Sequence, residues 1–319
     1  MLGDDYRKDV LVVEISGKRP GTAKARPTER FFIPHDHLII TNNCDGYETN
    51  WDIVEVPQDF REYYIEHYKM HKSAYYAPMN RSYAIKYARE HGYKYLVQLD
   101  DNISHLEIRY RIPGEIRGLY RASSTVEMMD DYIELLCCVL DNTNAGMAGC
   151  SLLGCSPPGK MVFLVERYCY SLFALKLDCC PDYFQGDFED DIEYRIKLKQ
   201  MGIPVVQVEP CGYGKTGQRS AKDESGCRAA YTEAGASRGD HMRKLNGDLY
   251  TAGLTSKPNG FSAGVERGGK FFRHQLAPWK VGILEKNPKK MSDMMLDILK
   301  KNAPEIKEKY ILRSKKIKE

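Results

Sequence analysis

The chain has 319 residues, of which 42% are hydrophobic and 29% charged, and its formal net charge is +3. This is an ordinary globular composition, in a chain long enough to hold a core without disulfide staples. No stretch approaches the roughly 18 to 20 consecutive apolar residues that cross a bilayer. The start, MLGDDYRKD, lacks the apolar core of a signal peptide, so we expect a soluble, non-secreted protein.

Ten cysteines are present, among them the adjacent pairs Cys137-Cys138 and Cys179-Cys180. Most lie within apolar runs and not in a regularly spaced framework, and Cys150 with Cys155 alone is too little for a zinc site. We therefore expect reduced, mostly buried thiols, which favours a cytoplasmic location.

The first half alternates strands and helices. Strands are predicted at 9–15, 38–41, 52–56 and 95–100, and helices at 59–72 and 80–92. This rhythm is typical of an α/β domain with a mostly parallel sheet, in which ligands bind beyond the carboxyl ends of the strands.

The second half continues with a helix at 125–142, strands at 145–154, 161–165 and 168–177, a helix from 187 to Gly202 and a strand at 203–209. The 168–177 strand is expected at a sheet edge. Residues 210–275 are rich in glycine and are expected to be long loops. We expect one domain at 1–284, with halves at about 9–125 and 126–284, and a basic, partly helical tail at 285–319.

Two acidic clusters stand out. Asp100, Asp101 and Asn102 directly follow the apolar strand 95–99, and adjacent carboxylates repel each other unless a positive charge lies between them. A divalent metal would supply that charge, although a simple turn also favours Asp and Asn. Glu189, Asp190 and Asp191 open the later helix, where the helix dipole alone favours negative charge.

The order of these features along residues 9–215 resembles the GT-A class of nucleotide-sugar glycosyltransferases. The resemblance implies a Rossmann-like, mixed sheet flanked by helices, with a loop-rich C-terminal acceptor region. It also implies that Asp100, Asp101 and Asn102 hold Mn²⁺ or Mg²⁺ and the donor. The base that deprotonates the acceptor would be Asp190, Glu189 or Asp191, and spacing does not choose among them.

Further positions fit the same resemblance. Ser16, Lys18 and Arg19 match an S-x-x-R-P loop that lines the nucleotide pocket, and Arg81 matches an arginine that approaches the diphosphate. His274 is the expected third metal ligand from the C-terminal region. Asn102 departs from the pattern, because the class places a carboxylate there and a neutral amide binds metal more weakly.

A narrower similarity lies in RPTERFFIPHDHLIITNN, YKYLVQLDDNI and FEDDIEYRIKLKQMG, which together resemble the TET/JBP-associated glycosyltransferases of phages and eukaryotes. This similarity implies transfer of a sugar from a UDP-sugar to the hydroxyl of a 5-hydroxymethylpyrimidine in DNA. For a phage-encoded chain the location would be the host cytoplasm. Basic segments at 18–30, 215–244 and 307–318 would contact the DNA phosphates.

Two alternatives remain open. A GT-A enzyme of this kind could instead act on a glycan, lipid or protein, and Asn102 also fits a catalytically silent nucleotide-binding module. The sequence does not reveal whether the sugar configuration is retained or inverted, although the clustered acids at 189–191 favour inversion, nor does it reveal the oligomeric state.

Overall fold

The computed structural model describes residues 4–17, 20, 30–68, 76–111, 119–123, 126–153, 162–165, 167–185, 190–215, 242, 244–255, 265–266, 270–276 and 281–304. The first half contains α1 (Asp4–Arg7), β1 (Val10–Ser16), β2 (Asp36–Thr41), β3 (Asp52–Glu55), α3 (Gln58–Tyr68), α4 (Tyr76–Glu90), β4 (Tyr95–Asp100), β5 (Ile103–Arg111) and β6 (Leu119–Ser123). The second half contains α5 (Met128–Asp141), β7 (Met147–Leu152), β8 (Phe163–Val165), β9 (Leu172–Lys176), α6 (Asp190–Gln200), β10 (Val205–Lys215), the 3₁₀ turn Gly247–Leu249, β11 (Tyr250–Thr255), β12 (Val265–Glu266), β13 (Lys270–Leu276) and α9 (Pro288–Asn302).

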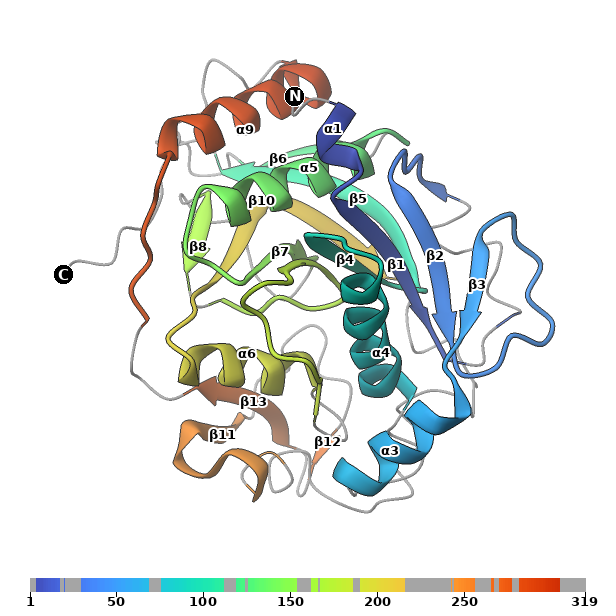
Figure 1. The fold of residues 1–319 in the computed structure, drawn as a ribbon. Helices are drawn as coiled ribbons and strands as arrows, with labels where there is room; N and C mark the ends of the chain where they lie inside the picture. The colour runs from blue at the N-terminus through green and yellow to red at the C-terminus, as the bar shows by residue number, and fades with distance from the viewer. Residues whose placement is uncertain are drawn as a thin grey trace.

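One large sheet forms the centre of the molecule (Figure 1). Its strand order is β3-β2-β1-β4-β9-β7-β10-β5-β6, and β8 pairs with β10. The strands β3, β2, β1 and β4 pair in parallel, whereas β9 is antiparallel to both of its neighbours. The predicted α/β class with a mixed sheet flanked by helices is confirmed.

The two faces of the sheet bury separate apolar clusters, as alternation along β1 shows. Val10 and Val12 face the cluster that contains α5 and α9, whereas Leu11 and Val13 face the cluster that contains α3 and α4. Successive side chains of a strand point to opposite faces, so a strand covered on both sides is mostly apolar. This explains the unbroken apolar run VLVV at 10–13 in β1.

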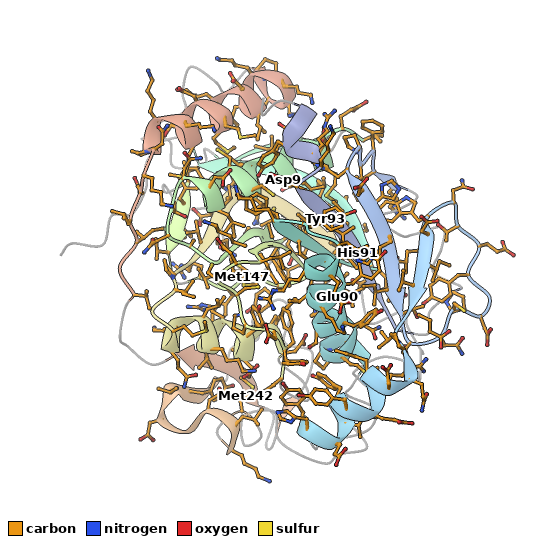
Figure 2. All side chains as sticks on the ribbon, in the orientation of Figure 1. Asp9, Glu90, His91, Tyr93, Met147 and Met242 are labelled. Atoms are coloured by element: carbon orange, nitrogen blue, oxygen red, sulfur yellow. The ribbon has the colours of Figure 1, made fainter. Side chains whose placement is uncertain are left out.

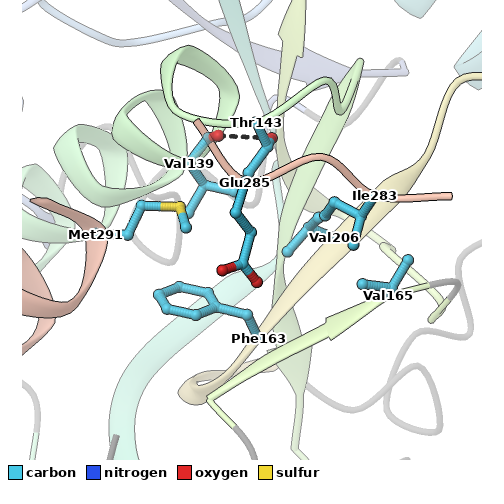
Figure 3. A pocket seen from close by; sticks show the side chains of 8 residues that line it. All are labelled: Val139, Thr143, Phe163, Val165, Val206, Ile283, Glu285 and Met291. Atoms are coloured by element: carbon cyan, nitrogen blue, oxygen red, sulfur yellow. Dashed lines mark hydrogen bonds between the residues drawn. The ribbon is translucent and has the colours of Figure 1, made fainter. Parts of the chain in front are cut away.

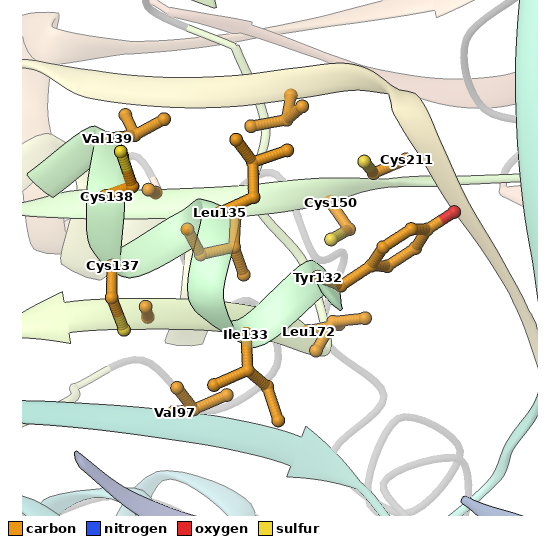
Figure 4. Close-up of a cluster of buried hydrophobic side chains, with 14 of the residues drawn as sticks. Val97, Tyr132, Ile133, Leu135, Cys137, Cys138, Val139, Cys150, Leu172 and Cys211 are labelled. Atoms are coloured by element: carbon orange, nitrogen blue, oxygen red, sulfur yellow. The ribbon is translucent and has the colours of Figure 1, made fainter. Parts of the chain in front are cut away.

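Helix α5 provides the centre of the first cluster. Its side chains from Met128 to Leu140 are buried except for Asp130 and Asp131, and Tyr132, Ile133 and Leu135 pack towards the sheet (Figure 4). Burial raises the pKa of the Cys137 and Cys150 thiols well above the usual range, which leaves them protonated and unreactive. Of the eight cysteines that the described residues include, all are free and six are buried, as expected.

Helix α9 lies on α5 and completes the same cluster. The side chain of Asn287 caps its first turn by accepting a hydrogen bond from the Lys290 N–H at 3.1 Å, and Pro288 stands at the first helical position. Met291, Met295 and Leu299 are buried at helical spacing. This part of the predicted tail is therefore packed against the core, while the boundary at 284/285 stays a prediction.

The turn between α4 and β4 sets the register of the central strands. The backbone N–H groups of Lys94 and Tyr95 both donate to the Asp9 carbonyl at 2.9 Å, and Gly92 adopts a left-handed φ of 79° that ends the helix. Asp9 and Tyr93 are neighbours at this end of the sheet (Figure 2). As a result Val10 pairs with Tyr95 and Ile15 pairs with Asp100.

Strand β10 bends as it crosses the sheet. Residues 205–208 and then 212–213 pair in parallel with β7, and the register of this pairing shifts between Val208 and Gly212. On its other edge, β10 pairs antiparallel with β5 over residues 211–215. Gly212 lies at the bend, where an added Cβ would come 2.9 Å from the Glu107 carbonyl oxygen. The bend returns the end of β10 to the segment that follows β4.

Several expectations need correction. The 168–177 segment forms β9 between β4 and β7, so it is an interior strand and not an edge strand. The strand predicted at 203–209 continues to Lys215, and the segment expected to be loops also contributes the sheet β11-β13-β12. The extension of β10 is stabilised by its pairing with β5, which lies about 100 residues earlier in the sequence. Strands β11, β12 and β13 stabilise one another by pairing. Among the described helices, none combines the length and apolar character needed to cross a membrane.

We predict that Leu299→Ala lowers the free energy of unfolding by about 2–5 kcal/mol, because it empties a fully buried site between α9 and α5. Urea denaturation followed by circular dichroism measures the change. Lys300→Ala on the exposed side of the same helix is the control and should change stability by less than about 1 kcal/mol. Equal effects of the two variants would show that α9 does not belong to the core.

Candidate active site at the carboxyl ends of β1 and β4

The predicted site residues of the first half converge where β1 and β4 end. These parallel strands place Ser16 and Asp100 at the same edge of the sheet, and helix α4 runs alongside and carries Arg81 (Figure 1). The first turn of α6 brings Asp190 to the same place. Carboxyl ends of parallel strands are where open α/β sheets bind ligands.

Asp100 lies between two cations. Its Oδ1 accepts from Arg81 Nη2 at 2.5 Å, and its Oδ2 accepts from Lys215 Nζ at 2.5 Å. Burial raises the pKa of Asp100, but the charges of Lys215 and Arg81 outweigh burial, and the net pKa lies well below the usual range. About 20% of the side chain remains exposed, so a ligand can reach this ionised carboxylate.

Asp101 points away from these cations, towards β1. It is fully buried, and its Oδ2 accepts a hydrogen bond from Ser16 Oγ at 2.9 Å. Ser16 Oγ also lies 2.8 Å from the Tyr47 hydroxyl, which in turn lies 3.2 Å from Thr41 Oγ1. The two adjacent acids therefore face different polar groups, which relieves the repulsion that the sequence implies.

Arg81 is the centre of the site. Its side chain is 4% exposed, Nη1 donates to Gln98 Oε1 at 3.1 Å and Nη2 donates to Asp100. Nε forms an ion pair with Asp190 Oδ2 at 2.9 Å, without the geometry of a hydrogen bond. Burial lowers the pKa of Arg81, whereas the carboxylates of Asp100 and Asp190 raise it more, so the guanidinium stays charged. Arg81 thus joins the strand-end acid to the acid that opens α6.

Two aromatic rings enclose the Arg81 guanidinium. Its central carbon lies 5.3 Å from the ring centroid of Phe173 and 5.8 Å from that of Phe184. Both rings lie within the distance at which a cation is attracted to an aromatic face. They also exclude water, so the ion pairs of Arg81 form in surroundings of low polarity.

A residue with a strained backbone, Ser171, contacts Asp100. The Asp100 N–H donates to the Ser171 carbonyl at 2.9 Å. Ser171 has a φ of 32°, in the left-handed region that a serine rarely adopts. Strained residues of this kind concentrate at functional sites, where neighbouring structure holds them in place.

The acids of the second cluster differ in their surroundings. Asp190 is paired with Arg81, whereas Asp191 Oδ1 accepts the N–H of its neighbour Ile192 at 2.8 Å. Glu189 lies outside the described residues, as do Lys18 and Arg19 of the predicted nucleotide loop. Of the three predicted bases, Asp190 is thus joined to the strand-end acid by Arg81, and the identity of the base stays a prediction.

Glu193 is a buried acid on the same helix as Asp190, and the sequence did not single it out. It lies one turn after Asp190, is 3% exposed, and accepts the Gln185 N–H at 3.1 Å, while its other oxygen lies 3.3 Å from Lys197 Nζ. Burial raises the pKa of Glu193 to about 7, although Lys197 opposes the shift. The available signal was the spacing of Glu193 and Lys197, an i,i+4 pair on α6.

The predicted metal ligands do not fit an ion at Asp100 as they are arranged. Both oxygens of this carboxylate already meet cations, Asp101 is buried against Ser16, and the part of the chain that the structure describes contains no group of three His, Cys, Asp or Glu suited to a metal. Two unit charges about 4 Å apart interact by about 4 kcal/mol at an effective dielectric of about 20, so Lys215 would repel an added cation.

His274 is placed only by its backbone. It lies in β13, where it pairs with Ala252 of β11 in the three-stranded sheet. Its role as a metal ligand, like metal binding as a whole, stays a prediction.

A separate cavity is too small to serve as the site. It has a volume of about 10 Å³, room for about one water molecule, and Glu285 enters it among apolar side chains that include Phe163 and Met291 (Figure 3). A nucleotide sugar cannot enter a space of this size.

Comparisons with known proteins give no family assignment. No family model and no curated protein matches the chain. A nucleotide-diphospho-sugar transferase candidate from Desulfovibrio desulfuricans shares 10% identity, covering 72% of this chain and 96% of its own, with a TM-score of 0.35. A mycobacterial protein shares 8% identity over 88% of this chain and 87% of its own, with a TM-score of 0.37. Scores this low do not establish a common fold.

We predict that Arg81→Met lowers the free energy of unfolding by about 3–5 kcal/mol, because it leaves the carboxylates of Asp100 and Asp190 without their shared cation. Urea denaturation measures the loss. Adding Asp190→Asn to this variant should restore part of the stability, since one uncompensated charge is then removed. Lys86→Ala, which breaks an exposed ion pair on the same helix, is the control and should cost less than about 1 kcal/mol.

We predict that Glu193 makes stability depend on pH. Its folded pKa of about 7 exceeds that of the unfolded chain, about 4.3, so its contribution is complete below the unfolded value and is lost as the pH rises to about 7. Unfolding free energies of the wild type and Glu193→Gln, measured from pH 4 to pH 8, should differ in slope over this window. Glu90→Gln, at an exposed position, should keep the wild-type slope, and parallel curves for Glu193→Gln would refute the assignment.

Proposed function

We propose that this protein is a GT-A-type glycosyltransferase that moves a sugar from a nucleotide-sugar donor to a hydroxyl group at the carboxyl ends of β1 and β4. The observation that carries the proposal is the ion-paired cluster in which Arg81 joins Asp100 to Asp190. It unites the two acidic clusters whose order resembles that class. Each lies far from the other in sequence, and both meet at the edge of the sheet where such enzymes bind donors.

In the proposed reaction Asp190 acts as the general base. Its carboxylate accepts the proton of the acceptor hydroxyl, the hydroxyl oxygen forms a bond to the anomeric carbon, and the bond from that carbon to the phosphate oxygen breaks. The electron pair leaves with the nucleoside diphosphate. Arg81 fixes Asp190 Oδ2, which positions the base relative to the donor side of the site.

The donor would lie along the ends of β1 and β4. Ser16, Tyr47 and Asp101 form a hydrogen-bonded group at the end of β1, with polar atoms suited to the nucleoside. Asn80 fixes this end of the strand, since its Nδ2 donates to the Ser16 carbonyl at 2.9 Å. A UDP-sugar is the proposed donor.

The proposed acceptor is the hydroxymethyl group of a 5-hydroxymethylpyrimidine in DNA. This choice follows the sequence similarity to the TET/JBP-associated group, and an aromatic cluster next to the acceptor side supports it. Tyr183 lies 5.3 Å from Tyr68 and 6.1 Å from Tyr63, measured between ring centroids, and Tyr63 is 47% exposed. Exposed aromatic rings of this kind can stack on an extruded base.

DNA would have to present the base outside the duplex. A hydroxymethyl group inside a base stack cannot reach the Asp190 carboxylate, so the target base must be flipped out or single-stranded. Three basic segments, 18–30, 215–244 and 307–318, would hold the flanking phosphates in a salt-dependent manner. Nearly all of their residues lie outside the described part of the chain.

The experiment that tests the proposal is mass analysis of nucleosides from DNA containing hydroxymethylcytosine or hydroxymethyluracil, after incubation with the protein and a panel of UDP-sugars. The expected result is a mass gain of one hexose or one pentose on the modified nucleoside. Unmodified DNA is the control. UDP release without any gain on DNA would contradict the DNA acceptor and favour a glycan, lipid or protein, and absence of both would contradict glycosyl transfer.

We predict that Asp190→Asn reduces transfer by about 10²-fold or more, because the amide keeps the shape but cannot accept the proton. Binding of UDP, measured by calorimetry, should stay within threefold of the wild type. Glu189→Gln and Asp191→Asn compare the two rival acids, and the largest loss identifies the base. Asp178→Asn, at a position with an exposed side chain, is the control for the loss of a negative charge.

A further inference from the structure

Lys215 reaches the site because β10 bends. It is the last residue of β10 and pairs with Ile103, the first residue of β5, which follows Asp100 by only three positions. An irregularity between Gly214 and Lys215 shifts the register at this point. The ammonium group thereby meets a carboxylate that lies 115 residues away in sequence.

The two cations at Asp100 differ in what they can still bind. Arg81 is 4% exposed, and its guanidinium is already paired with the carboxylates of Asp100 and Asp190 and hydrogen-bonded to Gln98. Lys215 is 21% exposed, and its ammonium group forms an ion pair with Asp100 Oδ2. An ammonium has three donors, so Lys215 can stay paired with Asp100 and also donate to an anion.

We propose that Lys215 is the phosphate-binding cation of the donor site, held in place by Asp100, and that the donor diphosphate binds here without a divalent ion on Asp100. This inference rests on the proposed function, because it concerns the same donor. A lysine ammonium is a compact point charge well suited to phosphate oxygens, with which it forms charge-assisted hydrogen bonds.

The chemical role of Lys215 follows from the charge that develops during transfer. As the bond between the anomeric carbon and the phosphate oxygen breaks, its electron pair stays on that oxygen, and the diphosphate becomes more negative. Lys215 stabilises this charge by hydrogen bonding and keeps its own proton. Asp100 holds the ammonium in position before the donor arrives, so little reorganisation is needed.

Calorimetric titration of the full chain with UDP tests the inference, once in EDTA and once in Mn²⁺. We expect the wild type to bind UDP in EDTA with an affinity within threefold of that in Mn²⁺. Lys215→Ala should weaken binding in EDTA by at least tenfold, and Lys215→Arg, which keeps the charge, should restore most of it. Lys300→Ala, on the exposed side of α9, is the matched control. Thermal unfolding confirms that each variant is folded.

The outcomes separate this inference from the proposed function. UDP binding that requires Mn²⁺, or binding in EDTA that Lys215→Ala leaves unchanged, overturns the role of Lys215 but leaves glycosyl transfer standing. Failure to bind UDP, GDP, CDP or ADP under either condition overturns both. Loss of UDP binding in both Lys215→Ala and Lys215→Arg, with both variants folded, overturns the role of Lys215 as a phosphate-binding charge, because arginine keeps that charge.

Discussion

The buried charge of Arg81 is the constraint on which the site depends. A guanidinium with 4% exposure is stable only if acceptors replace the water it has lost, and Gln98, Asp100 and Asp190 are those acceptors. They come from a strand and from a helix remote in sequence. The need to satisfy one cation therefore fixes the end of β4 and the start of α6 relative to α4.

The same network explains how two adjacent acids coexist at the end of a buried strand. Asp100 turns towards Arg81 and Lys215, while Asp101 turns towards the hydroxyl group of Ser16. A divalent ion was one way to supply the positive charge that the sequence demands. Here Arg81 and Lys215 supply it. Arg81 is deeply buried among its partners, whereas Lys215 is partly exposed.

Local signals predicted much of the fold. The apolar runs of β1 and β4, the spacing of apolar residues in α5 and the glycine stop after α4 are each readable within a short window, and each forms close to its predicted place. The adjacent pair Asp100-Asp101 and the acidic start of α6 also marked the site. Strand β5 was missed, although Leu106, Glu107 and Ile108 show the alternation of a half-buried strand.

The remaining site residues could not be predicted, for physical reasons. The role of Lys215 depends on the bend of β10 and on its pairing with β5. The residues around Lys215 in the sequence give no signal of either. Glu193 looks like an ordinary member of a surface ion pair, and only the packing of α6 against the sheet makes it buried. Long-range pairing and burial decide such cases, whereas a single sequence reports local preference.

The position of α9 has a consequence for how the protein is made. The cluster that α9 completes with Met291, Met295 and Leu299 also contains Val10 and Val12 of the first strand. During synthesis the N-terminal strands leave the ribosome long before α9 exists, so this face of the sheet stays partly uncovered until residue 299 has emerged. Closure of this part of the core therefore comes late in synthesis, after residues 10–299 have been made.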